Sequence, residues 1–280
     1  MARLLVFGLG YTARALVRRL GPEWSVTGTT HDGRDGSIRF DRDHSLPDEI
    51  FADVTHVLVS IPPDEQGDPV YDIHGADLAH AHLQGKLSWV GYLSTTGVYG
   101  TREGGWVDET SELRPTGSRG ERRVGAETAW LHLQRQHGVP VHVFRLAGIY
   151  GPGRSALDAL RDGSARRIDA GDQVFSRIHV DDIASVLLAS IAQPQPGAIY
   201  NVCDDEPAAQ AEIVAHAARL LGVEPPSIVP LAEADLSPMA RSFYADNKRV
   251  SNALIKQELG VILSYPNYRV GLSAIIAAGG

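Results

Sequence analysis

The chain has 280 residues, of which 43% are hydrophobic and 21% are charged, a composition typical of a globular protein with a substantial buried core. Its formal net charge of −8 argues against non-specific binding to nucleic acid. The single cysteine, Cys203, excludes an internal disulfide framework and a multi-cysteine metal site. No targeting segment is visible and no apolar run approaches the roughly 20 residues that span a bilayer, so we expect a cytoplasmic protein that is not bound to a membrane.

Short apolar runs alternate with helical patterns along the chain. Apolar runs rich in Val and Leu are typical of strands buried on both faces of a sheet, and we predict strands at Arg3–Phe7, Ser25–Thr30, Ile38–Phe40, His56–Ser60, Leu87–Ser94, Val141–Arg145 and Ile199–Val202. Helices are predicted at 11–20, 70–83, 121–136, 181–191 and 212–221, a loop is predicted at 224–230, and the periodicity is weaker from 252–259 onward. This alternation indicates βαβ units with right-handed crossovers and an α/β fold with a doubly wound parallel sheet.

A glycine-rich turn joins the first predicted strand to the first predicted helix. Gly8 permits a tight turn, Gly10 lets a pyrophosphate approach the backbone, and the small Ala13 lets the helix pack close to the strand. Phosphates bound there would lie at the N-terminus of the helix. Since the turn follows a strand, precedes a helix and opens a series of βα units, it predicts a dinucleotide site that includes Leu9, Tyr11 and Thr12.

The end of the second predicted strand, Gly28-Thr-Thr-His-Asp-Gly-Arg34, bears on the identity of the dinucleotide. A carboxylate at this position would bind the ribose 2′-hydroxyl of NAD, whereas basic groups suit the 2′-phosphate of NADP. No carboxylate stands at the strand end itself, and Asp32 comes slightly later. We therefore expect Thr30, His31 and Arg34 to contact the cofactor and NADP to be preferred over NAD, with an ordinary loop as the alternative.

Several later stretches of the chain resemble the extended short-chain dehydrogenase/reductase family, the NAD-dependent epimerase/dehydratase group. The similar stretches, in the order of the family, are LSTTGVYG (93–100), FRLAGIYGPGR (144–154), SRIHVDDIA (176–184), AIYNVCDDEP (198–207) and DNKRVSNALIKQELG (246–260). The resemblance implies a Rossmann-type core over 1–152 completed by 172–205, and a smaller C-terminal substrate lobe formed by 153–171 and 206–280. It also implies a small-molecule substrate, a possible homodimer, and cofactor contacts at Ser60, Ile61, Ser94 and Ala147.

The catalytic pair of the family is missing at its expected place. The family uses a Tyr and a Lys four residues later on one helix face, so that the lysine and the cofactor lower the pKa of the phenol. Registering the chain on Ala126-Glu127 puts Arg119 at the Tyr position and Arg123 at the Lys position. A guanidinium stays protonated and does not replace a phenol as proton donor, although it can bind an anion. The sequence has one Tyr with a Lys at i+4, Tyr244 and Lys248, which lies far along the chain and is taken as coincidence.

The remaining site candidates are a hydroxyl and four substrate residues. The resemblance assigns Thr95 the role of the family's catalytic Ser/Thr, although it can equally be a strand-end hydroxyl that satisfies the backbone. We expect the substrate near Tyr99, Tyr150, Arg154 and Arg177. The family's diphosphate-binding arginine falls on Phe175, which weakens the case for a sugar-nucleotide substrate.

Histidines do not form a convincing metal site in the sequence. His80 and His82 are two residues apart and point to different faces of a helix, so together with His74 they are expected to be solvated or capping residues. His179 with Asp181 and Asp182 is interpreted as architectural, and no metal is expected.

Two hypotheses for function follow. The first is an NAD(P)-dependent oxidoreductase or epimerase acting on a small carbonyl, hydroxyl or sugar-type substrate, whose proton comes from water, a substrate group or Tyr99. The second is a noncatalytic NAD(P)(H)-binding sensor or regulatory protein, in which Arg119, Arg122 and Arg123 form an anion site or a solvated face.

Overall fold

The computed structural model describes residues 1–279, without the side chains of Pro238 and Met239. Its main sheet runs in the order β11-β7-β5-β4-β1-β2-β3, and every adjacent pair in it is parallel. The strands are β1 (Ala2–Phe7), β2 (Trp24–Thr30), β3 (Ile38–Arg39), β4 (His56–Val59), β5 (Trp89–Thr95), β7 (Val141–Leu146) and β11 (Ile199–Val202). The order reverses beside β1, which is the topology of a doubly wound Rossmann-type sheet.

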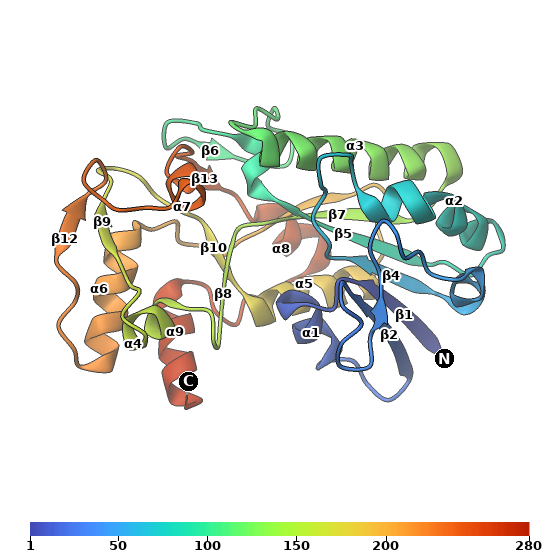
Figure 1. Ribbon diagram of the computed structural model, residues 1–280, viewed down its shortest axis with the longest axis horizontal. Helices are drawn as coiled ribbons and strands as arrows, with labels where there is room; N and C mark the ends of the chain where they lie inside the picture. Colours follow the sequence, from blue (N-terminus) through green and yellow to red (C-terminus); the bar gives the residue numbers. More distant parts are fainter. Residues whose placement is uncertain (280) are drawn as a thin grey trace.

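Helices cover both faces of this sheet (Figure 1). One face packs against α1 (Tyr11–Val17), α5 (Val180–Ala192) and α8 (Ala253–Leu259), and the other against α2 (Pro69–Leu83) and α3 (Ser118–His137). The crossover after β3 is abbreviated to a 3₁₀ turn, η1 (Asp48–Asp53).

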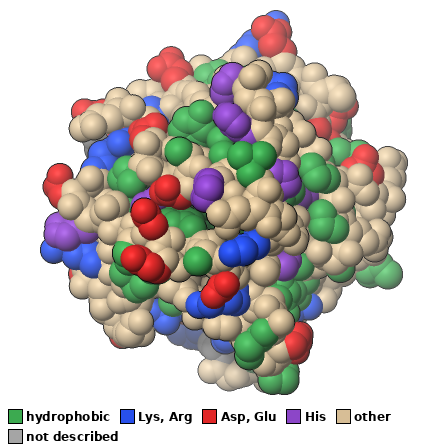
Figure 2. All heavy atoms as spheres, turned by 90° about the vertical axis from the view of Figure 1, so that its right-hand side faces the viewer, with side chains coloured by type: hydrophobic (Ala, Val, Ile, Leu, Met, Phe, Trp, Pro, Cys, Tyr) green, Lys and Arg blue, Asp and Glu red, His purple; other side chains and the backbone are tan. Residues whose placement is uncertain are grey.

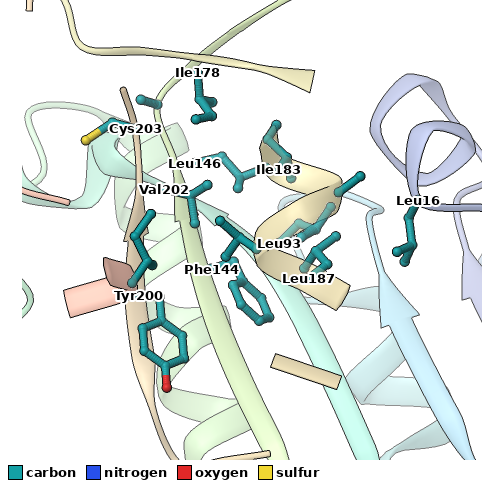
Figure 3. Close-up of a cluster of buried hydrophobic side chains, with 14 of the residues drawn as sticks. Leu16, Leu93, Phe144, Leu146, Ile178, Ile183, Leu187, Tyr200, Val202 and Cys203 are labelled. Carbon is teal, nitrogen blue, oxygen red and sulfur yellow. The ribbon is translucent and has the colours of Figure 1, made fainter. Parts of the chain in front are cut away.

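The strands are buried on both sides because their apolar side chains alternate between two hydrophobic clusters. In β1, Leu4 and Val6 belong to the cluster under α1 and α5, whereas Leu5 and Phe7 belong to the cluster under α2 and α3. Figure 3 shows the first cluster, whose labelled residues are Leu16, Leu93, Phe144, Leu146, Ile178, Ile183, Leu187, Tyr200, Val202 and Cys203. Each such side chain, when fully buried, stabilises the fold by roughly 1.5–3 kcal/mol, so the sheet is a rigid base for its edges.

Segments from the second half of the chain supply a smaller lobe beside the sheet (Figure 1). Its helices are α4 (Ala156–Arg161), α6 (Gln210–Leu221), α7 (Pro238–Phe243) and α9 (Tyr268–Ala277). Three short parallel pairs link segments distant in sequence: β6 (Trp106–Val107) with β13 (Arg249–Val250), β8 (Gly148–Tyr150) with β10 (Arg177–His179), and β9 (Arg167–Asp169) with β12 (Ile228–Pro230). The prediction of a loop at 224–230 is therefore wrong at its end, where residues 228–230 form β12. The local sequence does not reveal this strand, because its partner β9 lies far away in the chain.

The surface opposite this lobe carries both signs of charge. Figure 2 shows acidic, basic, histidine and apolar side chains interspersed on the face that contains the amino-terminal end of the chain. Within residues 1–279, the structure has no helix that is both long enough and apolar enough to cross a bilayer.

Candidate functional site

The predicted cofactor residues come together at one edge of the sheet. Because the strands are parallel, their carboxyl ends meet, and the register pairs Phe7 with Val59 and Thr95 with Leu146. The residues that follow these ends, including Gly8, Ser60 and Ala147, therefore lie along one edge of the sheet. Ligands of open α/β sheets bind at this edge.

The glycine turn has the shape that a dinucleotide site requires. Gly8 has φ +88°, and a Cβ on it would approach Cγ1 of Ile61 to 2.9 Å. A Cβ on Gly10 would instead meet only the Gly8 carbonyl oxygen at 4.0 Å, so open space lies beside Gly10. Gly28 also lacks room for a side chain, because a Cβ on it would lie 2.6 Å from Cδ2 of Leu9. The turn is thus tightly packed at its base and open where a phosphate would approach.

Helix α1 begins at this turn without a side-chain cap. Its N-cap is Gly10, whose carbonyl accepts the first helical hydrogen bond, from the Arg14 backbone N–H at 2.9 Å. The N–H groups of the first turn are therefore available to an anion, and the residues here fit a bound pyrophosphate. Tyr11 Oη donates to the Pro152 carbonyl oxygen at 3.0 Å, which ties the start of α1 to the lobe.

The segment after β2 presents basic side chains to solvent. The His31 side chain is 84% exposed and that of Arg34 is 69% exposed. Asp32 accepts a hydrogen bond from Thr30 Oγ1 at 3.0 Å and lies 3.6 Å from the Arg34 guanidinium. The Asp32 carboxylate therefore interacts with Thr30 and Arg34, and the basic side chains of His31 and Arg34 are exposed to solvent.

Two neighbouring hydroxyls at the end of β5 have different environments. Ser94 is 4% exposed and its Oγ donates to Glu127 Oε1 at 2.5 Å, so its hydroxyl hydrogen is used by a buried protein group. Thr95 is half-buried, and its Oγ1 accepts a hydrogen bond from the Gly97 N–H at 3.1 Å. Among the described residues, none accepts the Thr95 hydroxyl proton, so this group can donate to a ligand.

A buried polar network runs beneath this edge, and the sequence did not reveal it. Glu127 and Arg145 form an ion pair at 2.7 Å with both side chains 3% exposed. Arg145 also donates to Tyr99 Oη at 2.8 Å, and Tyr99 Oη donates to Asn201 Oδ1 at 2.7 Å. The only available signal was a charged residue inside the apolar run Val141–Leu146.

This network corrects the expectation for Tyr99. The residue is fully buried, both hydrogen-bonding functions of its hydroxyl are used, and burial raises the pKa of Tyr99 to about 12. Tyr99 therefore has neither the exposure nor the free hydroxyl that a substrate contact or a proton donor needs.

The three arginines at the start of α3 lie in three different environments. The Arg119 guanidinium lies 5.8 Å from the centroid of the Phe243 ring, and Arg122 pairs with Glu65 at 3.3 Å. Arg123 donates to the Leu93 carbonyl oxygen and, at 3.2 Å, to Tyr92 Oη. They do not converge on one anion site, and Arg123 is bound to the end of β5.

The other substrate candidates lie around a cavity of about 420 Å³ in the lobe. Tyr150, Arg154 and Arg177 line it together with residues of α4, α6 and α9. Arg177 is half-buried and donates to the Phe175 and Ala208 carbonyl oxygens and to Gln210 Oε1, and desolvation lowers the pKa of Arg177 to about 10. Arg154 is exposed and lies over the Tyr11 ring at 5.8 Å.

The histidine clusters have structural environments. His179 caps α5 by accepting the Asp181 N–H, as its architectural interpretation predicts. His74 is buried rather than solvated, because Nε2 accepts the Leu46 N–H and Nδ1 lies 2.8 Å from Asp77. Within residues 1–279, no group of three or more His, Cys, Asp or Glu side chains is arranged to hold a metal ion.

The Tyr244–Lys248 match does not form a helical pair. Tyr244 caps the end of α7, and Lys248 lies beyond the helix and pairs with Asp246 at 3.0 Å. The segment nevertheless lies beside the start of α3, since Asp246 accepts a hydrogen bond from Thr116 at 2.5 Å.

Comparison with known proteins places this site in a family. The chain is 51% identical to a conserved protein of unknown function from Silicibacter pomeroyi, with a TM-score of 0.92 and 99% of each chain covered. It is 28% identical to the Escherichia coli protein YeeZ over 95% of this chain and 97% of that protein. A dTDP-glucose 4,6-dehydratase from Bacillus anthracis in complex with NAD shares the fold, with a TM-score of 0.76 and 18% identity over 99% of this chain and 96% of that chain. The model of the NAD-dependent epimerase/dehydratase family matches residues 4–203, and the chain belongs to that family.

Proposed function

We propose that the chain binds a nicotinamide dinucleotide at Gly8–Ala13 and prefers NADP to NAD. The open space beside Gly10 and the uncapped N-terminus of α1 support a bound pyrophosphate. The exposed His31 and Arg34, next to an Asp32 already engaged by Thr30, support a 2′-phosphate. When bound, the nicotinamide would supply or accept a hydride.

The function that this arrangement supports best is an oxidoreductase or epimerase acting on a small carbonyl, hydroxyl or sugar-type substrate. The observation that carries it is Thr95, whose half-buried hydroxyl is free to donate to a substrate oxygen at the cofactor edge. Arg119 and Arg123 do not deliver the proton, because guanidinium groups stay charged at working pH. In this proposal the proton comes from water or from a group on the substrate.

A noncatalytic NAD(P)(H)-binding sensor is the second candidate. The observation that favours it is Arg123, whose guanidinium is bound to the Leu93 carbonyl and Tyr92. A cation held by the protein in this way is less available to lower the pKa of a catalytic group. Cofactor binding is common to both candidates, and turnover separates them.

The test is a turnover screen. The purified 280-residue chain is mixed with NADPH or NADH and a panel of carbonyl and nucleotide-sugar compounds, and the absorbance of the reduced cofactor is followed. The enzyme proposal predicts cofactor consumption with at least one compound, faster with NADPH. Binding of cofactor without consumption across the panel would favour the sensor.

The setting that we propose is the cytoplasm, with small molecules as the partners and a homodimer by analogy with the family. The single buried Cys203 supports a reducing compartment. Chromatography with light scattering measures the oligomeric state.

A further inference from the structure

The cavity in the lobe has an apolar wall and an arginine, Arg154, for whose guanidinium no described residue is a hydrogen-bond acceptor. The residues that line it are Tyr150, Gly153, Arg154, Ser155, Ala156, Asp158, Ala159, Asp162, Arg177, Gln210, Ile213, Tyr268 and Leu272. Its volume of about 420 Å³ falls in the range of small-molecule sites. The chemistry that it offers depends on which polar groups are already engaged by the protein.

Most of the charged groups in this cavity are engaged. Arg177 has three protein acceptors and is half-buried. Asp158 accepts the N–H and Oγ of Ser155 in a capping box, and Asp162 accepts the Ser164 N–H. By contrast, no described residue accepts a hydrogen bond from the Arg154 guanidinium, which is exposed and lies over the Tyr11 ring.

Arg154 connects the cavity to the cofactor turn. Tyr11 directly follows Gly10, and its hydroxyl donates to the Pro152 carbonyl two residues before Arg154. The Arg154 guanidinium therefore lies against the side chain of the first residue of α1.

We propose that this cavity binds a small amphipathic carboxylate. The planar guanidinium of Arg154 would donate two hydrogen bonds to the carboxylate, and Ile213, Leu272 and Tyr268 would contact the apolar part of the ligand. This inference goes beyond the proposed function, because the lining of the cavity includes neither Thr95 nor another residue of β5.

The experiment compares 3-phenylpropionate with its neutral amide, 3-phenylpropanamide, by calorimetric titration into the full chain. The wild type should bind the carboxylate about tenfold more tightly than the amide, as expected for a charge-assisted hydrogen-bonded pair. Arg154→Gln should remove this difference by weakening carboxylate binding alone. Arg135→Gln, a matched change at an exposed arginine of α3, should preserve the difference.

A second variant locates the bound compound. Ala159→Phe adds a ring inside the cavity and should abolish binding of both compounds, with folding checked by circular dichroism. Equal affinity for the two compounds, failure of the wild type to bind either, or an unchanged preference in Arg154→Gln would overturn the inference. Titration of NADPH into the same samples separates the two proposals: NADPH binding without carboxylate binding rejects the cavity's role alone, and the reverse rejects the proposed function alone.

Discussion

The guanidinium of Arg123 donates a hydrogen bond to Tyr92 Oη at 3.2 Å, and the same nitrogen also donates to the carbonyl oxygen of Leu93. This arginine stands where the family resemblance puts a lysine, one helical turn after Arg119. Because Arg123 is bound to β5 and position 119 has no phenol, the usual proton route of the family has no counterpart here. The proposed enzyme therefore depends on Thr95 for substrate orientation and on a proton from elsewhere.

Replacement of Thr95 tests that dependence. In the enzyme proposal, Thr95→Ala lowers kcat roughly a hundredfold, because one hydrogen bond to a developing oxyanion is lost. Thr95→Ser keeps the hydroxyl and should keep most of the activity. Both variants are assayed with the best compound of the turnover screen, and equal activity of Thr95→Ala and wild type would remove Thr95 from the mechanism.

Arg34 tests the choice of cofactor. Arg34→Gln should weaken NADPH binding roughly tenfold and leave NADH binding unchanged, because a charged hydrogen bond to the 2′-phosphate is lost. Arg3→Gln is the matched control, since Arg3 pairs with Asp53 next to the amino end of β1. Calorimetric titrations of both cofactors measure the effect, and parallel losses for NADPH and NADH would contradict a 2′-phosphate contact.

The buried pair of Glu127 and Arg145 is expected to hold the sheet edge in place. Glu127→Gln leaves the Arg145 cation in the interior without its counter-charge, at a cost of about 3 kcal/mol in the free energy of unfolding. Glu121→Gln, on the exposed first turn of α3, should change the free energy of unfolding by less than about 0.5 kcal/mol. Denaturant unfolding compares the two, and similar midpoints would show that the buried pair contributes little.

Asp204 predicts a dependence of stability on pH. Its Oδ2 makes no hydrogen bond within the part of the chain that the structure describes, and burial raises the pKa of Asp204 to about 8. The unfolded value is roughly 3.9, so between these values the folded chain binds the extra proton. The contribution of Asp204 to the free energy of unfolding is thus present below about pH 4 and is lost as the pH rises through about 8.

Asp204→Asn should remove this part of the pH dependence. As the pH rises from 5 to 9, the wild type is expected to lose stability relative to Asp204→Asn, as measured by the free energy of unfolding. Denaturant titrations at pH 5, 7 and 9 measure it. A constant difference across this range would show that Asp204 ionises normally in the folded protein.

The sheet and the glycine turn at its edge, where we propose the cofactor site, were predictable because local patterns determine them. The run Leu4–Phe7 is apolar on both faces and precedes Gly8, so strand, turn and helix follow from neighbouring residues. The pairing of β9 with β12 depends on residues about 60 positions apart, for which the sequence has no local signal. The same holds for the burial of Tyr99, which is determined by Arg145 and Asn201 rather than by its own surroundings in the chain.

The most direct test of the account is a calorimetric titration of NADPH into the wild type and into Gly10→Ala. The added methyl group meets no protein atom closer than 4.0 Å, so it should leave folding intact while occupying the space reserved for the pyrophosphate. We predict one NADPH per chain for the wild type and affinity reduced by about tenfold or more in Gly10→Ala. Gly125→Ala, in an open position of α3, should bind as the wild type does. A wild-type chain that binds neither NADPH nor NADH, or a Gly10→Ala variant that binds as tightly as the wild type, would contradict the cofactor site.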